Sequence, residues 1–190
     1  MTEPDAAIHE IIESLNRAGI PAMLTGSFAS AFHGTPRATQ DIDFVIEADV
    51  DRLRRFVESL PPDRYYVDEG AALDALRDRS MFNVLDRVGG WKIDLVIRKD
   101  REFSRMEFSR RQGGKLAGRS IEVVTAEDLV IAKLEWAKAG RSERQLNDAA
   151  GILAVQAARL DRDYVQRWVR ELGLEREWLD ALSRIPGAAS

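Results

Sequence analysis

The chain has 190 residues, a length that fits one domain or a core with a small appendage. It contains no cysteine and two histidines, which excludes disulfides, thiol nucleophiles and iron–sulfur clusters and leaves little for a histidine-rich metal site. The formal net charge of −4 excludes a uniformly basic nucleic-acid-binding surface, so carboxylates are the main chemical groups available.

The N-terminal residues 1–7 lack the apolar core of a signal peptide. No stretch of 18 uninterrupted apolar residues occurs, which predicts that no segment spans a membrane. We therefore expect a cytoplasmic protein.

Strand and helix patterns alternate up to residue 124. They predict helices over 5–18, 28–32, 49–60, 71–77 and the start of 101–111, and strands over 22–25, 42–47, 65–67, 80–86, 91–98 and 120–124. The runs 80–86 and 91–98 form a predicted hairpin, and a second hairpin is expected around Gly118.

Only helical patterns follow residue 125. They predict helices over 126–139, 143–157, 161–172 and 175–184. Thr125 and Ser142 each open a predicted capping box, Asp161 is a predicted N-cap, and Gly173 is a predicted C-cap. The sequence thus predicts an α+β protein with a core at 1–125 and a helical subdomain at 126–190.

Two aspartates stand at the start of the predicted strand 42–47. Asp41 and Asp43 are two residues apart, so both side chains point to one face of a strand. Neighbouring carboxylates repel each other unless a cation lies between them, and magnesium is the natural oxygen-seeking candidate. The alternative is one aspartate that caps a turn and one that is solvated. A calcium-binding loop is excluded, because position 45 is Val and no glycine follows at the sixth place.

Asp94 lies within the apolar run 91–97, where an acidic residue is costly unless it is paired or metal-bound. The alternative is an edge strand on which Asp94 faces water. If its strand lies beside that of Asp41 and Asp43, three carboxylates share one face. Such a set could hold two metal ions for in-line displacement at phosphorus.

Gly26 and Ser27 stand where a predicted strand passes into a helix. Backbone N–H groups at a helix start, a glycine and a hydroxyl together suit a phosphate, although such a pair alone is usually an ordinary turn and cap.

Together, Gly26-Ser27, Asp41-Ile42-Asp43 and the later Asp94 resemble the motifs of the DNA polymerase beta-like nucleotidyltransferase superfamily. The string from Ala31 to Asp43 is similar to that of bacterial abortive-infection-type nucleotidyltransferases, which include toxins of toxin–antitoxin systems. Their later lysine motif is matched by three residues, Lys133, Arg144 and Asp148, although Asn147 stands where the toxins usually carry arginine.

The resemblance implies a small mixed β-sheet flanked by helices and transfer of a nucleoside monophosphate from an NTP to a hydroxyl acceptor, with two Mg²⁺ ions. It implies that Asp41 and Asp43 bind both ions and that Asp94 binds one and helps to deprotonate the acceptor. The implied nucleotide-binding residues are Gly26, Ser27, Arg37, Thr39 and Lys133. For Arg37, pairing with Asp41 or Asp43 when metal is absent and simple loop anchoring are the alternatives.

Residues 98–119 carry eight basic and three acidic side chains, a net charge of +5. This segment could bind a polyanionic acceptor such as tRNA, or be a solvated surface hairpin. RNA, a small hydroxylated molecule such as an aminoglycoside, and a protein all stay open as acceptors. An antitoxin partner belongs to the toxin interpretation. A catalytically silent binding module that acts with a protein partner is the alternative to an enzyme.

Overall fold

The computed structural model describes residues 3–116 and 119–185. Its strands are β1 (Ala22–Thr25), β2 (Asp41–Ile46), β3 (Tyr65–Val67), β4 (Met81–Asp86), β5 (Lys92–Ile97), β6 (Gln112–Leu116) and β7 (Arg119–Val123). Its helices are α1 (Glu3–Ala18), α2 (Gly26–Phe32), α3 (Val50–Ser59), α4 (Glu69–Asp78), α5 (Glu102–Ser109), α6 (Ala126–Gly140), α7 (Glu143–Gln156), α8 (Arg162–Glu171) and α9 (Glu175–Ser183).

The chain divides into two compact units. The first comprises Met1–Phe28 and Ala38–Val124, and the second comprises Ala29–Arg37 and Thr125–Ser190. The division at Val124 lies one residue from the boundary expected from the sequence. Residues 29–37, expected in the core, instead belong with the C-terminal helices, so the division passes through α2.

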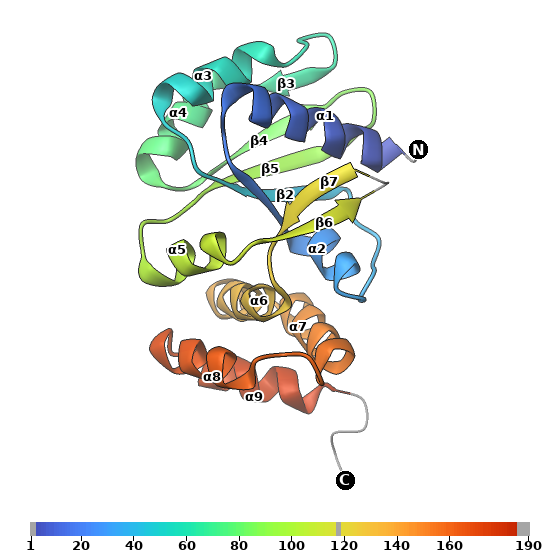
Figure 1. Cartoon of the computed structure of the whole chain (residues 1–190), viewed down its shortest axis with the longest axis vertical. Coiled ribbons are helices and arrows are strands. Elements are labelled where there is room, and N and C mark those ends of the chain that lie inside the picture. Colours follow the sequence, from blue (N-terminus) through green and yellow to red (C-terminus); the bar gives the residue numbers. More distant parts are fainter. Residues whose placement is uncertain (1–2, 117–118, 186–190) are drawn as a thin grey trace. The chain divides into compact units, whose positions relative to one another are not determined.

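The first unit is built on a seven-stranded sheet in the order β3-β4-β5-β2-β1-β7-β6. The pairs β2–β5 and β1–β7 are parallel and the other pairs are antiparallel, so the sheet is mixed. Figure 1 shows α1, α3 and α4 along one face of this sheet. The strong twist visible in the central strands is the usual right-handed twist of β-structure.

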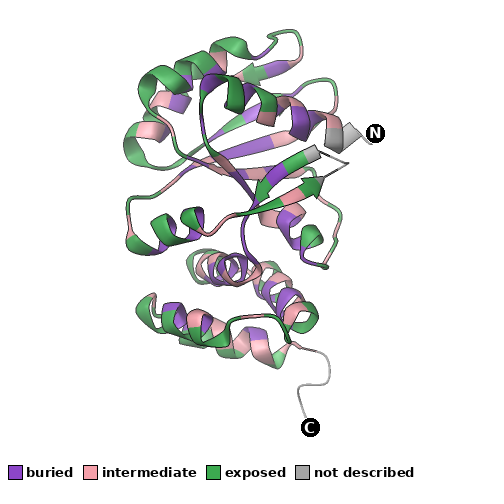
Figure 2. Ribbon diagram, in the orientation of Figure 1, coloured by how far each residue is buried: buried purple, intermediate pink, exposed green. Residues whose placement is uncertain are grey.

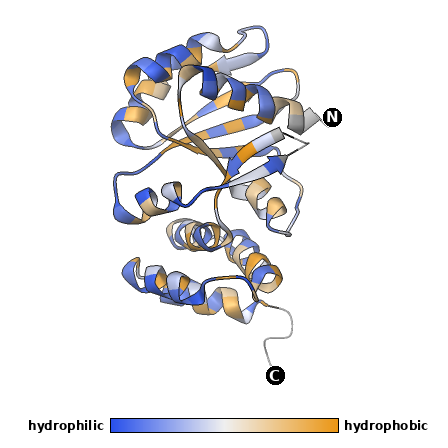
Figure 3. Ribbon diagram, in the orientation of Figure 1, coloured by the Kyte–Doolittle hydropathy of each residue, from blue (hydrophilic) through white to orange (hydrophobic). Residues whose placement is uncertain are grey.

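Period-2 alternation determines which face of each central strand meets the core. In β2, Ile42, Phe44 and Ile46 are fully buried while the intervening residues are half-buried. The register sets Ile93, Leu95 and Ile97 of β5 beside them, so the two strands present one continuous apolar face. Buried and hydrophobic residues accordingly gather on the central strands (Figures 2 and 3).

The second unit contains α6 to α9 and residues 29–37. Thr125 caps α6 by accepting a hydrogen bond from the backbone N–H of Asp128, and Asp161 caps α8 in the same way from Tyr164, as predicted. Gly173 follows α8 with φ of +64°, the left-handed conformation expected of a C-terminal glycine.

One expected feature of this unit is wrong. Ser142 precedes α7, but its side chain makes no capping hydrogen bond. Gln145, which would complete the capping box, instead accepts a hydrogen bond from Lys133 through its side-chain oxygen at 3.1 Å. The amide is therefore committed to a tertiary contact, and the local motif does not form.

None of the helices formed by the described residues has the length and apolar character needed to cross a bilayer.

Candidate active site

Four polar residues lie side by side across four neighbouring strands of the first unit. Thr25 of β1 is in register with Asp43 of β2, Asp43 with Asp94 of β5, and Asp94 with Asn83 of β4. Residues paired in this way point to the same face, and neighbouring strands lie about 4.8 Å apart. These four side chains therefore form one row, which we call the polar row. The conditional expectation that the strand of Asp94 adjoins that of Asp43 is confirmed.

Asp41 lies next to the polar row, two residues before Asp43 and on the same face of β2. Its register partner on β5 is Lys92. The Thr39 hydroxyl accepts a hydrogen bond from the backbone N–H of Asp41 at 3.1 Å and donates one to its carbonyl oxygen at 3.3 Å. Thr39 thus fixes the start of β2, and its binding of nucleotide stays a prediction.

Gly26 makes room for the carboxylate of Asp43. Its φ of +65° is a left-handed conformation, and a Cβ built on it would lie 1.9 Å from Oδ2 of Asp43. Only a hydrogen fits at this position, so the glycine is required by sterics and by backbone conformation together. Ser27 follows it and is buried.

Asp94 is 7% exposed, and both of its carboxylate oxygens accept hydrogen bonds. The Lys92 ammonium donates to Oδ2 at 2.8 Å, and the side-chain amide of Asn83 donates to Oδ1. A carboxylate buried in an apolar strand needs such partners, because an unpaired charge there is strongly unfavourable.

The three aspartates act together on Lys92. Its hydrogen bond to Asp94 raises the pKa of the Lys92 ammonium, and the negative charges of Asp94, Asp41 and Asp43 raise it further against the opposing effect of partial burial. The ammonium is therefore firmly charged and neutralises part of the carboxylate charge on this face.

The carboxylate oxygens on this face are the type of ligand that a hard divalent cation prefers. Asp43 and Asp94 are neighbours on one face, Asp41 shares that face, and Gly26 leaves beside Asp43 a space that a Cβ would fill. Among the residues that the structure describes, however, no three His, Asp or Glu side chains converge closely enough to hold a metal ion.

Lys133 and Arg37, two of the predicted nucleotide-binding residues, meet in the second unit at Asp148. Lys133 is almost fully buried in α6, and its ammonium lies 2.8 Å from Oδ2 of Asp148 on α7. Arg37 Nε approaches the same oxygen at 3.4 Å. The other predicted site residues belong to the first unit: Gly26, Ser27, Thr39, Asp41, Asp43 and Asp94.

Acidic partners neutralise part of the basic segment 98–119. Arg98 pairs with Glu47 at 2.9 Å and lowers the pKa of that carboxyl, and Arg105 pairs with Asp100 at 2.7 Å. Arg111 stacks on the ring of Phe108, 4.4 Å from its centroid. The expected turn at Gly118 and the side chain of Arg119 lie outside the described residues. Glu47 lies outside the segment and offsets one of its positive charges, whereas Asp100 is already included in the net charge of +5.

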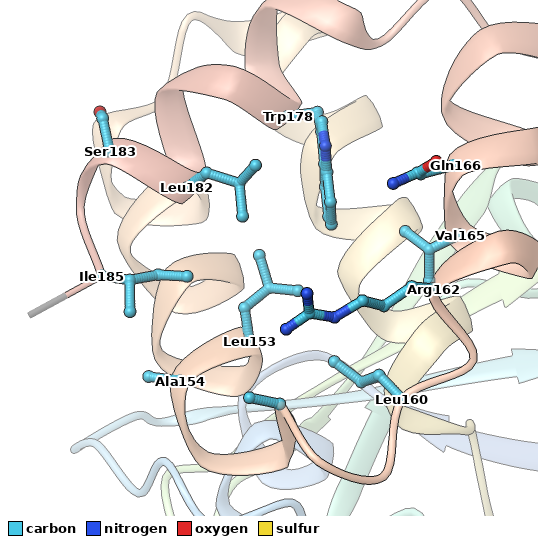
Figure 4. A pocket seen from close by; sticks show the side chains of 11 residues that line it. Leu153, Ala154, Leu160, Arg162, Val165, Gln166, Trp178, Leu182, Ser183 and Ile185 are labelled. Atoms are coloured by element: carbon cyan, nitrogen blue, oxygen red, sulfur yellow. The ribbon is translucent and has the colours of Figure 1, made fainter. Parts of the chain in front are cut away.

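A cavity of about 760 Å³ opens among the helices of the second unit (Figure 4). Its wall is mainly aliphatic, with Trp178, Gln166 and Arg162 as its larger polar or aromatic members. Among the described residues that line it there is no carboxylate, so it lacks the acidic groups of the polar row.

Sequence reasoning missed Asn83 and Gln145 as partners of site residues. Asn83 lies on the exposed face of an alternating strand and carries no local signal of its role. Its function follows only from the β4–β5 register, which aligns it with Asp94. Lys92 lies two residues before Asp94 on the same strand, so alternation places both on one face, but the ion pair between them has no signal in the sequence.

No protein-family model matches the chain, and no curated protein matches its sequence. Solved structures do match its fold. The solution structure of the antibiotic-resistance factor ANT(2'')-Ia is similar at a TM-score of 0.55 and 14% identity, over 93% of this chain and 95% of that one. A crystal structure of ANT(2'')-Ia in complex with adenylyl-2''-tobramycin is similar at 0.51 and 13% identity, over 96% of this chain and 97% of that one.

A third match is an antigenic nucleotidyltransferase-like protein from Paracoccidioides brasiliensis, with a TM-score of 0.53, 16% identity, and coverage of 96% of this chain and 93% of that one. At such identities the likeness establishes the fold. The chain therefore has a nucleotidyltransferase fold, in agreement with the polymerase beta-like resemblance of its motifs.

Proposed function

We propose that the protein is a magnesium-dependent nucleotidyltransferase that moves a nucleoside monophosphate from an NTP to a hydroxyl acceptor. The observation that carries the proposal is the register of Asp43 with Asp94, with Asp41 on the same face, in a sheet of the nucleotidyltransferase fold. A chance pair of aspartates would not be expected to adjoin a third on a neighbouring strand with a left-handed glycine packed against it.

The reaction forms a bond between the acceptor oxygen and the α-phosphorus and breaks the bond to the β-phosphate oxygen, so that pyrophosphate leaves. Asp41, Asp43 and Asp94 would hold the Mg²⁺ ions, which when bound supply charge neutralisation and orient the phosphates. Asp94 would accept the proton of the attacking hydroxyl. Gly26 and Ser27 would contact the β- and γ-phosphates.

Arg37 and Lys133 would provide positive charge for the triphosphate. Both are held by Asp148, which fixes the ammonium and the guanidinium through one oxygen. Asp148 acts as a positioning residue in this proposal, because it restricts the rotamers of two long side chains that would otherwise be mobile.

A sugar hydroxyl of a small molecule is the first acceptor to test, because one structure of similar fold contains adenylyl-2''-tobramycin. RNA is the second, through the basic segment 98–119. The two Mg²⁺ ions, the RNA acceptor, an antitoxin partner and a cytoplasmic location stay predictions from the sequence.

The test is an assay with each labelled NTP, Mg²⁺ and a panel of aminoglycosides, total RNA and the protein itself. We expect label transfer by the natural protein and at least a thousandfold loss in the double variant Asp41→Asn/Asp43→Asn. Asp49→Asn/Asp51→Asn is the matched control, because these aspartates have the same spacing but lie exposed at the start of α3. Undiminished transfer by the Asp41/Asp43 variant would refute the proposal.

A silent binding module is distinguished by a nucleotide titration with and without Mg²⁺. The proposed enzyme binds NTP more tightly with the metal, whereas a silent module binds it equally in both conditions or not at all.

A further inference from the structure

Both carboxylate oxygens of Asp94 accept hydrogen bonds from side chains of its own sheet. Lys92 occupies Oδ2 and Asn83 occupies Oδ1. The two partners differ in chemistry, since one is a cation and the other is a neutral amide. They also differ in freedom of movement. Asn83 is a short side chain held by its register with Asp94, whereas the long Lys92 side chain is 41% exposed.

The Lys92 ammonium lies among the three aspartates of this face. Its residue is in register with Asp41, its nitrogen contacts Asp94, and Asp43 is the register partner of Asp94. Without a cation, three carboxylates sharing one face would repel one another. Lys92 supplies that cation from within the chain.

We propose that Lys92 is an internal counter-ion that competes with a divalent cation for Asp94, and that Asn83 is the positioning residue that keeps the carboxylate oriented in both states. The inference rests on the proposed function, because it concerns the same carboxylates. The Lys92 ammonium lies 2.8 Å from Oδ2, and its positive charge repels a divalent ion that approaches the same oxygen, so the ion binds as Lys92 swings away. Its partial exposure lets the ammonium be solvated when it leaves.

Competition predicts opposite effects for the two partners. Removing the ammonium in Lys92→Met should tighten divalent-ion binding about two- to fivefold, the range expected for loss of a partly exposed ion pair. Removing the amide in Asn83→Ala should weaken binding, because Asp94 then loses its fixed orientation. A purely structural role for both residues would weaken binding in both variants.

The experiment measures free Mn²⁺ by electron paramagnetic resonance in a titration of nucleotide-free protein, with thermal melts in parallel. Lys92→Met should melt below the natural protein without Mn²⁺ and gain more from its addition. Arg77→Met removes the same charge from an exposed ion pair on α4 and should leave Mn²⁺ affinity unchanged. Asp94→Asn should abolish the difference that Lys92→Met makes. If Lys92→Met does not fold, Lys92→Gln replaces it.

Equal or weaker Mn²⁺ binding by Lys92→Met, with binding intact in the natural protein, overturns the inference and leaves the proposed function standing. Absence of Mn²⁺ binding from both proteins at millimolar concentration overturns the metal-dependent function, and the inference with it.

Discussion

At the scale of single residues, the candidate site depends on matched side-chain sizes as much as on charge. The carboxylate of Asp43 occupies the volume that any side chain at position 26 would need. Such close approach of a functional group to backbone is a recurrent reason for a glycine in a left-handed conformation. The same sterics make Gly26 a sensitive test of where Asp43 must lie.

We predict that Gly26→Ala abolishes nucleotidyl transfer and Mn²⁺ binding while destabilising the fold by about 1–3 kcal/mol. Gly90→Ala is the matched control, because Gly90 has a similar φ of +70° but open space around its Cα. The control should lose only the about 1 kcal/mol of unfolding free energy that a left-handed alanine costs, and it should keep activity. The measurements are label transfer and urea unfolding. If the Gly26→Ala protein is active, nucleotidyl transfer does not require the Asp43 carboxylate in its position beside residue 26.

At the scale of elements, the sequence predicted nearly every helix and strand within two residues at each end. Hydrophobic periodicity and punctuation by glycine and proline are local signals, so they suffice for that purpose. The register of β2 on β5 depends on contacts between distant parts of the chain. The sequence therefore allowed the adjacency of Asp43 and Asp94 to be stated only as a condition. The pairing of Asn83 with Asp94 could not be predicted for the same reason. At Ser142 the opposite occurs. The sequence has a local capping motif, but the motif does not form because Gln145 accepts a hydrogen bond from Lys133 instead.

The turn between β4 and β5 also depends on a buried carboxylate, that of Asp86. Its Oδ1 accepts hydrogen bonds from the backbone N–H groups of Val88 and Gly89, and Arg64 pairs with Oδ2 at 3.1 Å. Burial alone would raise the pKa of Asp86, but Arg64 and the two N–H groups together outweigh it and lower that pKa. The ionised form is therefore the one that stabilises this turn.

We predict that Asp86→Asn lowers the free energy of unfolding by about 1–3 kcal/mol at pH 7. The folded state binds this proton less tightly than the unfolded state, so the contribution is complete above about pH 4 and is lost as the pH falls through the lowered pKa. The difference between natural protein and variant should shrink in acid. Asp78→Asn is the control, since Asp78 forms a fully exposed pair with Arg77 and its loss should leave the urea midpoint unchanged. A pH-independent difference would contradict the assignment.

At the scale of the whole molecule, the second unit is assembled from two separate parts of the sequence. Residues 29–37 contain the buried Ala29, Ser30 and His33, and the His33 carbonyl accepts a hydrogen bond from Gln156 on α7 at 2.8 Å. Thr35 packs against Gly151, where a Cβ would lie 2.9 Å from its methyl group. The sequence could not reveal this assignment, because the segment is short and its contacts are with residues more than a hundred positions away.

We predict that a fragment of residues 125–190 is less stable than the same fragment with residues 29–37 joined through a flexible glycine–serine linker. Loss of the hydrogen bond and of the packing on α7 should cost about 2 kcal/mol, or about 10 °C in Tm for a domain of this size. Circular dichroism melts of the two fragments make the comparison, and a scrambled 29–37 segment is the control. Equal melting temperatures would mean that the C-terminal helices form a self-sufficient core.

The pairing of β2 with β5 has a consequence for when the site can exist at all. Side chains alternate between faces along a strand, so sliding β5 by one residue against β2 would turn Asp94 into the apolar core and bring Ile93 or Leu95 out beside Asp43. The two carboxylates become neighbours only in the native alignment of segments that are distant in the chain. A ligand that needs both of them is therefore a reporter of completed folding, and during refolding its binding should appear no earlier than the docking of these two strands.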